Sequence, residues 1–209
     1  MPCSWGQHTS PAAAWGDGAM ADGAAAIKVL GICGSLRRGS YNRMALEAAR
    51  KLAPEGVTID VFEGLRDIPP YDEDVRSGGL PPAVQEFRDR IKAADAVLLV
   101  TPEYNYSVPG VLKNAIDWAS RPPEQPFDDK PVAIMSASPG LFGGVRAQYH
   151  LRQCFVYLDA KILNRPEVFI GEAGKKFADD GTLTDERTAK AIAGLLEGLR
   201  AWTVRLKGS

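Results

Sequence analysis

The sequence predicts an α/β fold, in which one parallel sheet is covered by helices on both faces. Short apolar segments of strand length alternate along the chain with longer segments in which apolar residues recur at helical spacing. Two segments that follow such strands are rich in Gly, Ser, Asn, Pro and Tyr. A length of 209 residues is enough for one domain of this class with a sizeable core.

Five strands are predicted from short apolar runs. Ile27–Cys33 is apolar enough for a strand buried on both faces, and Ala96–Val100 is the most continuously apolar run. Val57–Phe62 alternates between apolar and polar residues, as a strand does. The predicted strands therefore cover residues 27–33, 57–62, 96–100, 132–135 and 167–170.

Five helices are predicted between and after these strands from apolar stripes at helical spacing. The Pro- and Gly-rich stretch of residues 68–80 is predicted to be a long surface loop, and Pro81 and Pro82 follow it near the start of a helix. The predicted helices contain the stripes at 44–52, 84–91, 111–119 and 192–202, and the segment 143–158.

The composition excludes several classes of protein. Lys and Arg total 25 against 26 Asp and Glu, a balance that argues against a dedicated nucleic-acid-binding protein. No apolar run approaches the roughly 18 residues of a membrane span. The three cysteines, Cys3, Cys33 and Cys154, are scattered, and His8 and His150 are the only histidines. We therefore expect no disulfide framework, no metal site and a cytoplasmic location.

Residues 1–26 are predicted to be a disordered extension, and residues 27–209 the folded domain. The first 26 residues contain no Leu, Ile, Val, Lys or Arg. They lack the basic start and apolar segment of a signal peptide. Translation from Met20 is an alternative, so it stays open whether this extension belongs to the native protein.

Two loops are expected to meet at one edge of the sheet. We expect the strand order 2-1-3-4-5, in which the order reverses between the first and third strands. Ligands of open α/β sheets bind at such a reversal, beyond the carboxyl ends of the strands. The loops that follow Cys33 and Val100 lie at these ends, so the sequence predicts one crevice between them.

The first loop, Gly31–Asn42, is typical of a phosphate site. Backbone N–H groups at a helix start attract anions. Ser35, Ser40 and Asn42 offer neutral hydrogen bonds, and Arg37 offers a charged one. The spacing matches neither the dinucleotide fingerprint nor the P-loop. It favours a terminal phosphate monoester, and the alternative is a plain turn in which Ser40 caps the helix.

The second loop, Thr101–Gly110, is typical of a site for a flat ring with polar edges. Its residues include Pro102, Glu103, Tyr104, Asn105 and Tyr106. Backbone amides and an asparagine can recognise the edge of a ring, and a tyrosine can cover its face. The alternative is an ordinary turn with aromatic packing.

A third segment, residues 136–144, follows the fourth predicted strand. Its glycines permit close approach of the backbone to a ligand, and Ser138 can bond to a ring edge. A simple turn is the alternative. Taken together, the three segments favour a phosphorylated aromatic cofactor, with FMN as the leading candidate.

Two long motifs carry a resemblance to a known family. G-S-L-R-x-G-S-x-N at Gly34–Asn42 and P-E-Y-N-Y-S-V-P-G-V-L-K-N-A-I-D-W at Pro102–Trp118 resemble the NADPH-dependent FMN reductases, and most closely their chromate/quinone reductase branch. The similarity covers about residues 27–205. It implies a flavodoxin-like three-layer sandwich that binds FMN and takes hydride from NADPH or NADH.

The resemblance also implies roles for individual residues. It places Arg121 near the substrate mouth and leaves two readings of Glu103, a flavin contact or a pair with a basic group across a dimer. It implies no catalytic side chain, because the chemistry takes place on FMN. The implied FMN contacts are Ser35, Arg37, Ser40 and Asn42 with Leu36 and Tyr41 for the phosphate, Pro102, Glu103, Tyr104, Asn105 and Tyr106 for the ring and ribityl chain, and Ser138, Gly140, Gly143 and Gly144 for the ring border.

The expected function is an FMN-dependent NAD(P)H oxidoreductase. Hydride would pass from NAD(P)H through FMN to quinones, chromate, azo compounds or free flavin, in ping-pong order, in a homodimer or homotetramer. The main alternative is an electron carrier of the flavodoxin type without NAD(P)H turnover. Carriers tend to be strongly acidic, and the balance of 25 basic to 26 acidic residues argues mildly against one. A flavin-free scaffold domain is a second alternative.

Overall fold

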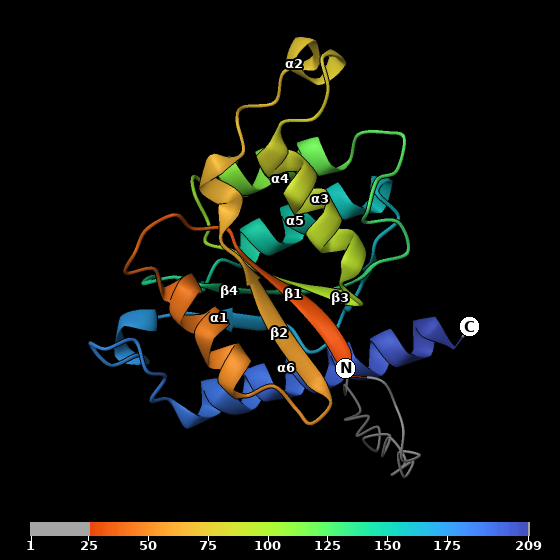
Figure 1. Ribbon diagram of the computed structural model, residues 1–209. Helices are drawn as coiled ribbons and strands as arrows, with labels where there is room; N and C mark the ends of the chain where they lie inside the picture. The colour runs from red at the N-terminus through yellow and green to blue at the C-terminus, as the bar shows by residue number, and fades with distance from the viewer. Residues whose placement is uncertain (1–25, 209) are drawn as a thin grey trace, which may run out of the picture.

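The computed structural model describes residues 26–208, which form a sandwich of three layers, helix, sheet and helix (Figure 1). The predicted extension, apart from Ala26, lies outside the described residues. All the strand pairs of the described sheet are parallel, as the alternating pattern predicts. The strands are β1 (Ile27–Cys33), β2 (Val57–Phe62), β3 (Ala96–Val100), β4 (Pro131–Ala137), β5 (Lys161–Ile162) and β6 (Val168–Ile170).

The strand order 2-1-3-4-5 is confirmed, with one refinement at the far edge. The outer neighbour of β4 consists of two short pieces. β5 pairs with the beginning of β4, and β6 pairs with its end. The sequence predicted the second piece only, because the two residues of β5 are too few to form a pattern. Pro166 lies between the pieces and has no N–H for a ladder bond, which fits the break.

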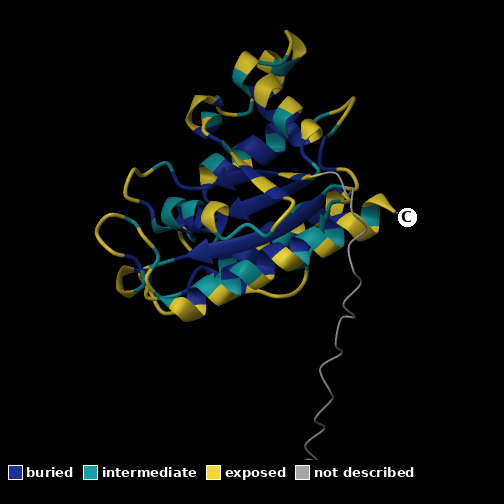
Figure 2. Ribbon diagram, turned by 60° about the horizontal axis from the view of Figure 1, so that its bottom comes forward, coloured by how far each residue is buried: buried dark blue, intermediate teal, exposed yellow. Residues whose placement is uncertain are grey.

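Helices cover both faces of the sheet and bury alternate residues of each strand. In β1, Val29 packs under α1 and α6, whereas Leu30 packs on the opposite side with α3, α4 and α5. Figure 2 shows the strands buried and the outer faces of the helices exposed. The helices are α1 (Tyr41–Lys51), α2 (Glu73–Ser77), α3 (Pro82–Ala93), α4 (Gly110–Ala119), α5 (Val145–Tyr157) and α6 (Glu186–Lys207), with 3-10 turns at Gly64–Asp67 and Ala173–Lys175.

The segment predicted as a surface loop, residues 68–80, contains the short helix α2. Asp72 caps it by accepting a hydrogen bond from the N–H of Asp74 at 2.9 Å. None of its residues is buried, and it projects from the body at the top of Figure 1. Val75 is its one large apolar residue, so no stripe was present from which the sequence could predict it.

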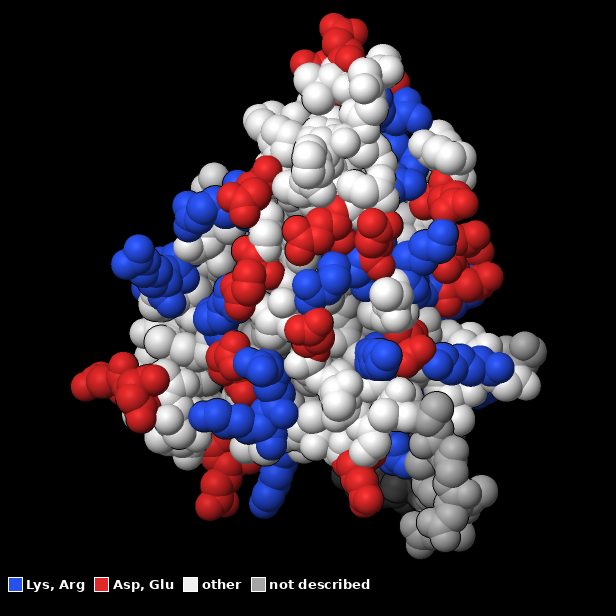
Figure 3. Space-filling model, in the orientation of Figure 1, with Lys and Arg blue, Asp and Glu red and all other residues white. Residues whose placement is uncertain are grey.

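The surface carries both signs of charge. Figure 3 shows Lys and Arg side chains interspersed with Asp and Glu over one face, and pairs such as Arg90–Asp60 at 2.6 Å bring them together. Among residues 26–208, no helix is both long and apolar enough to cross a membrane. Within the same range, no group of three His, Cys, Asp or Glu side chains could hold a metal ion.

Candidate functional site

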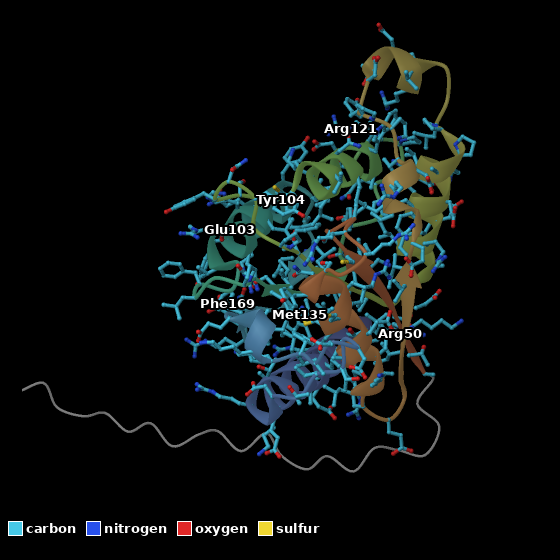
Figure 4. All side chains as sticks on the ribbon, turned by 90° about the vertical axis from the view of Figure 1, so that its left-hand side faces the viewer. Arg50, Glu103, Tyr104, Arg121, Met135 and Phe169 are labelled. Carbon is cyan, nitrogen blue, oxygen red and sulfur yellow. The ribbon has the colours of Figure 1, made fainter. Side chains whose placement is uncertain are left out.

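The loops after β1, β3 and β4 lie side by side, as the strand order predicts. The N–H of Gly34 donates to the carbonyl of Val100 at 2.8 Å, and the N–H of Thr101 donates to the carbonyl of Met135 at 3.0 Å. Each loop is therefore joined to the neighbouring strand at its first residue. Figure 4 views this side of the molecule and labels Glu103, Tyr104 and Met135.

The first loop opens α1 with a side-chain cap. Ser40 is buried, and its hydroxyl accepts a hydrogen bond from the N–H of Asn42 at 3.2 Å. Arg37 is exposed, and its guanidinium lies 5.7 Å from the ring centroid of Tyr41. Within residues 26–208, Arg37 has no carboxylate partner. Its charge is therefore available for an anion beside the start of α1.

A hollow of about 260 Å³ lies against this loop. Ser35, Leu36 and Arg37 line it together with Arg38, Arg43, Glu63 and Arg66 on its other sides. Arg43 is paired with Glu63, and Arg66 donates to the carbonyl of Leu36 at 2.9 Å. Four guanidinium groups against one carboxylate make the hollow strongly cationic. This set of donors fits the double negative charge of a phosphate monoester.

Asn42 has a structural partner that the sequence did not identify. Its side chain donates to the carbonyl of Ala137 at 2.9 Å and accepts from the N–H of Ala137 at 2.8 Å. The side chain is buried and joins the start of α1 to the end of β4. The contribution of Asn42 to a phosphate site stays a prediction, and the bonds to Ala137 fix the position of the start of α1 relative to β4.

The second loop is a miniature hairpin. Tyr104 and Ser107 exchange two backbone hydrogen bonds of 3.0 Å each. Between them, Asn105 and Tyr106 have φ values of 48° and 66°, the pattern of a type I′ turn. Asparagine is common in this conformation, but a tyrosine there is strained. Contacts outside the turn must therefore hold Tyr106 in place.

Glu103 caps the helix that follows the third loop. The helix α5 begins after Gly144, which has no side chain to offer. The Glu103 carboxylate instead accepts from the N–H groups of Arg146 at 3.1 Å and Ala147 at 3.3 Å, and from the Arg146 guanidinium at 2.5 Å. Burial opposes ionisation of this carboxyl, but the Arg146 bonds and the helix N–H groups outweigh it and lower the pKa of Glu103.

The pair Glu103–Arg146 also bears on the two readings of Glu103. The structure gives this carboxylate a basic partner in its own chain, 43 positions away. The Glu103 side chain is only 9% exposed. A basic group from a second copy is therefore not needed to balance its charge.

Two glycines of the third loop, Gly143 and Gly144, are required by packing and by the backbone conformation. Gly143 and Gly144 have φ values of 60° and 86°. A Cβ on Gly143 would lie 2.8 Å from the backbone nitrogen of Gly171 and from the backbone carbonyl carbon of Phe169. The structure thus explains the glycine at position 143 by packing against the backbone of residues 169–171, whereas the sequence suggested close approach to a ligand. The hydroxyl of Ser138 accepts from the N–H of Gly140 at 3.1 Å, which shapes the rest of this loop.

Arg121 is not brought together with the other predicted residues. It follows the last turn of α4, where Nε donates to the carbonyl of Asp117 at 3.1 Å. Its guanidinium lies 5.5 Å from the ring centroid of Tyr71. The ring loop precedes the opposite end of this ten-residue helix, roughly 15 Å away by the helical rise. Figure 4 shows Arg121 and Tyr104 separated along α4.

The sequence missed the residues of α5 that hold the second loop. The Arg146 guanidinium lies 3.8 Å from the ring centroid of Tyr106 and 5.1 Å from that of Phe142. His150 Nδ1 lies 3.1 Å from the hydroxyl of Ser107. Arg146 and His150 are four positions apart on one helical face, and this spacing just after two glycines was the available signal.

Comparison with known proteins gives a consistent family. The model of the NADPH-dependent FMN reductase family matches residues 27–175. An NAD(P)H-dependent FMN reductase from Pseudomonas aeruginosa is 57% identical over 182 residues, which is 87% of this chain and 98% of the relative. An NAD(P)H:quinone oxidoreductase from Solanum tuberosum is 47% identical, over 87% of this chain and 95% of its own. A quinone reductase from Escherichia coli (strain K12) is 44% identical, over 87% of this chain and 97% of its own.

A solved structure agrees with these relatives. The flavoenzyme NAD(P)H:(acceptor) oxidoreductase from Paracoccus denitrificans superposes with a TM-score of 0.79 at 36% identity. The match covers 86% of this chain and 98% of that one. The predicted family resemblance and the predicted flavodoxin-like fold are both confirmed.

Proposed function

Because the chain belongs to the NADPH-dependent FMN reductase family, we propose that its three loops hold FMN at the carboxyl ends of β1, β3 and β4. The chain is an NAD(P)H-dependent FMN and quinone reductase, with FMN as cofactor and NAD(P)H as donor. The three relatives described above are named as reductases or oxidoreductases, and the match covers at least 95% of the length of each. The alternative of an electron carrier without turnover receives no support.

The cationic hollow at the first loop is the observation that carries the placement of the phosphate. Ser35 and Ser40 offer hydroxyl groups at the start of α1, and Arg37 offers a guanidinium without a carboxylate partner within the described range. A phosphate monoester there would gain charge-assisted hydrogen bonds and the favourable end of the helix dipole. Leu36 also lines this hollow, whereas Ser40, Tyr41 and Asn42, which belong to the same proposed subsite, are not among its lining residues.

The ring would lie against the second and third loops. The hairpin of residues 102–107 and the loop of residues 138–144 border the same edge of the sheet. Bound FMN supplies hydride acceptance and electron transfer, while the protein binds and orients it. The residues proposed for this contact are Pro102, Glu103, Tyr104, Asn105, Tyr106, Ser138, Gly140, Gly143 and Gly144.

Among acceptors, quinones stand first, because two of the relatives described above are named for quinone reduction. Chromate, azo compounds and free flavin remain part of the proposal as further two-electron or stepwise acceptors. Arg121 would attract anionic acceptors such as chromate. It lies at the far end of α4 from the ring loop, so we propose this role with Arg121 supplied by a neighbouring copy in a homo-oligomer.

Exposed apolar residues on α5 favour a homo-oligomer. Tyr157 and Val156 are 89% and 80% exposed, and Tyr106 and Phe142 lie beyond the other end of the same helix. A second copy that covered this face would bury them and lie beside the proposed ring site. A homodimer or homotetramer is therefore proposed, and sedimentation equilibrium measures it. A cytoplasmic location is proposed from the low cysteine content.

An acceptor panel tests the proposal. The purified protein is reconstituted with FMN and supplied with NADPH or NADH and, in turn, a benzoquinone, chromate, an azo dye or free flavin. We expect oxidation of the nicotinamide with the quinone and parallel lines in double-reciprocal plots, as ping-pong order requires. A protein that retains no flavin, or retains it without oxidising either donor, would contradict the proposal.

A further inference from the structure

One turn of α5 holds the second loop at three points. The Glu103 carboxylate accepts from the backbone of Arg146 and Ala147, as described above. The ring of Tyr106 lies against the Arg146 guanidinium, and Ser107 contacts the ring of His150. The Ala147 contact uses a backbone N–H group, and the side chains of Arg146 and His150, four positions apart, lie on the same face of the helix.

Tyr106 is the most strained of these loop residues. Its φ of 66° lies in the left-handed region, where a bulky side chain is rarely stable. Its side chain is 67% exposed, so burial in a core does not hold it. The one close contact described for its ring is the Arg146 guanidinium, at 3.8 Å from the ring centroid. This stacking opposes relaxation of the turn.

Arg146 is itself fixed on its other sides. Its guanidinium bonds to the buried Glu103 carboxylate, and this bond raises the pKa of Arg146. Phe142 approaches the same guanidinium, with its ring centroid 5.1 Å away. A planar group is needed to stack on a ring and bind a carboxylate at once, and lysine cannot do both.

We propose that Arg146 is a positioning residue, which holds the hairpin Tyr104–Ser107 in the shape that receives the flavin ring. This inference rests on the proposed placement of FMN against that hairpin. Arg146 acts through Tyr106 and takes no part in the chemistry itself. When the guanidinium is lost, the strained turn relaxes and the loop must be ordered again at each binding event.

The test compares four proteins that have been freed of flavin: wild type, R146K, Y106G and the double variant. R146K keeps a charge for Glu103 but loses the planar stack, whereas Y106G removes both the ring and the backbone strain. FMN affinity is measured by quenching of flavin fluorescence. Arg50→Lys is the matched control, since Arg50 lies on an exposed face of α1 and pairs with Glu47 at 2.9 Å.

We expect R146K to weaken FMN binding about tenfold and R50K to leave it unchanged. In the Y106G background the same change should weaken binding less than about threefold, because Arg146 then has no ring to hold. Wild-type affinity in R146K, or an equal loss in both backgrounds, overturns the inference. The oligomeric state of each variant is measured by sedimentation, so that a change in FMN affinity caused by altered oligomerisation is distinguished from one caused by the loop.

A second measurement does not depend on FMN. The N–H of Ser107 donates to the carbonyl of Tyr104, so its hydrogen exchange reports whether the hairpin is closed. Faster exchange in flavin-free R146K than in wild type is expected, and equal exchange refutes the inference even if the variant is unstable. Arg37→Ala separates the two proposals. If both R37A and R146K bind FMN normally, the proposed cofactor site is wrong, and if only R146K does, this inference alone fails.

Discussion

Asn42 and Ala137 are joined by two hydrogen bonds although 95 positions separate them in the sequence. The side-chain amide of Asn42 satisfies both the N–H and the carbonyl of Ala137 at the end of β4. The amide thus makes the same pair of hydrogen bonds to Ala137 that the backbone of a neighbouring strand would make. The start of α1, with its proposed phosphate donors, is held in register with the loop that follows β4.

Asn42→Ala should destabilise the flavin-free protein by about 2 to 4 kcal/mol. The change leaves the N–H and carbonyl of Ala137 buried without these partners, and each unsatisfied group costs about 1 to 3 kcal/mol. Chemical denaturation measures the free energy of unfolding. Gln153→Ala on an exposed position of α5 is the control and should change it by less than about 0.5 kcal/mol. A loss in N42A as small as that of the control would contradict the structural role.

Arg37→Ala should mainly weaken retention of FMN. A charge-assisted hydrogen bond contributes about 1.5 to 3 kcal/mol, which corresponds to a loss of roughly 10- to 150-fold in affinity. Thermal unfolding of the flavin-free variant should match wild type, because Arg37 is exposed. Arg200→Ala, which breaks a surface pair on α6, is the control and should bind FMN normally. An R37A protein that holds flavin as tightly as wild type would show that the phosphate lies elsewhere.

Gly143→Ala should cost at least about 2 kcal/mol of stability. The added Cβ meets the backbone of residues 169–171, which cannot move without shifting β6, and the φ of 60° is unfavourable for alanine. Gly110→Ala is the matched control, because a Cβ there meets nothing within 4 Å. It should be neutral or slightly stabilising at the start of α4. Equal unfolding temperatures for the two variants would be incompatible with the packing described.

Glu103 should make stability depend on pH in the acidic range. Its pKa is lowered in the folded protein, so its stabilising effect is complete above the ordinary value of 4.5. That effect is lost as the pH falls from there through the lower folded value. Glu103→Gln should cost about 2 kcal/mol at pH 7, and the difference from wild type should shrink below pH 4.5. Urea unfolding from pH 7 to pH 3 measures this, and a constant difference across that range would argue against an ionised Glu103 in the fold.

The sequence predicted the sheet well, because strands buried on both faces leave continuous apolar runs. Ala96–Val100 is the clearest case, and its bounds as β3 agree with the prediction. The two-residue β5 and the polar helix α2 were missed, since neither buries enough apolar surface to mark the sequence. The position of β5 depends on its pairing with β4, and that of α2 on contacts with the rest of the protein, and neither can be seen in the local sequence.

The contacts within the candidate site were harder to predict, for a related reason. Gly, Ser and Arg in the first loop indicate an anion site through their own chemistry, so the sequence predicts such a role for this loop, and that role stays a prediction. Glu103–Arg146 and Asn42–Ala137 join residues 43 and 95 positions apart, and only the folded chain brings them together. The strain at Tyr106 was equally hidden, because a tyrosine after an asparagine is no sign of a left-handed backbone.

The projecting segment of residues 68–80 is a position at which insertions and deletions should be tolerated. The helix α2 buries none of its residues, and Tyr71 at its base is anchored to Asn114 of α4 by a hydrogen bond of 2.7 Å. Residues beyond that anchor can be inserted or removed at little cost to the sheet. A fluorescent reporter or an affinity tag placed between Val75 and Gly79 would therefore sit on a stalk, remote from the three loops.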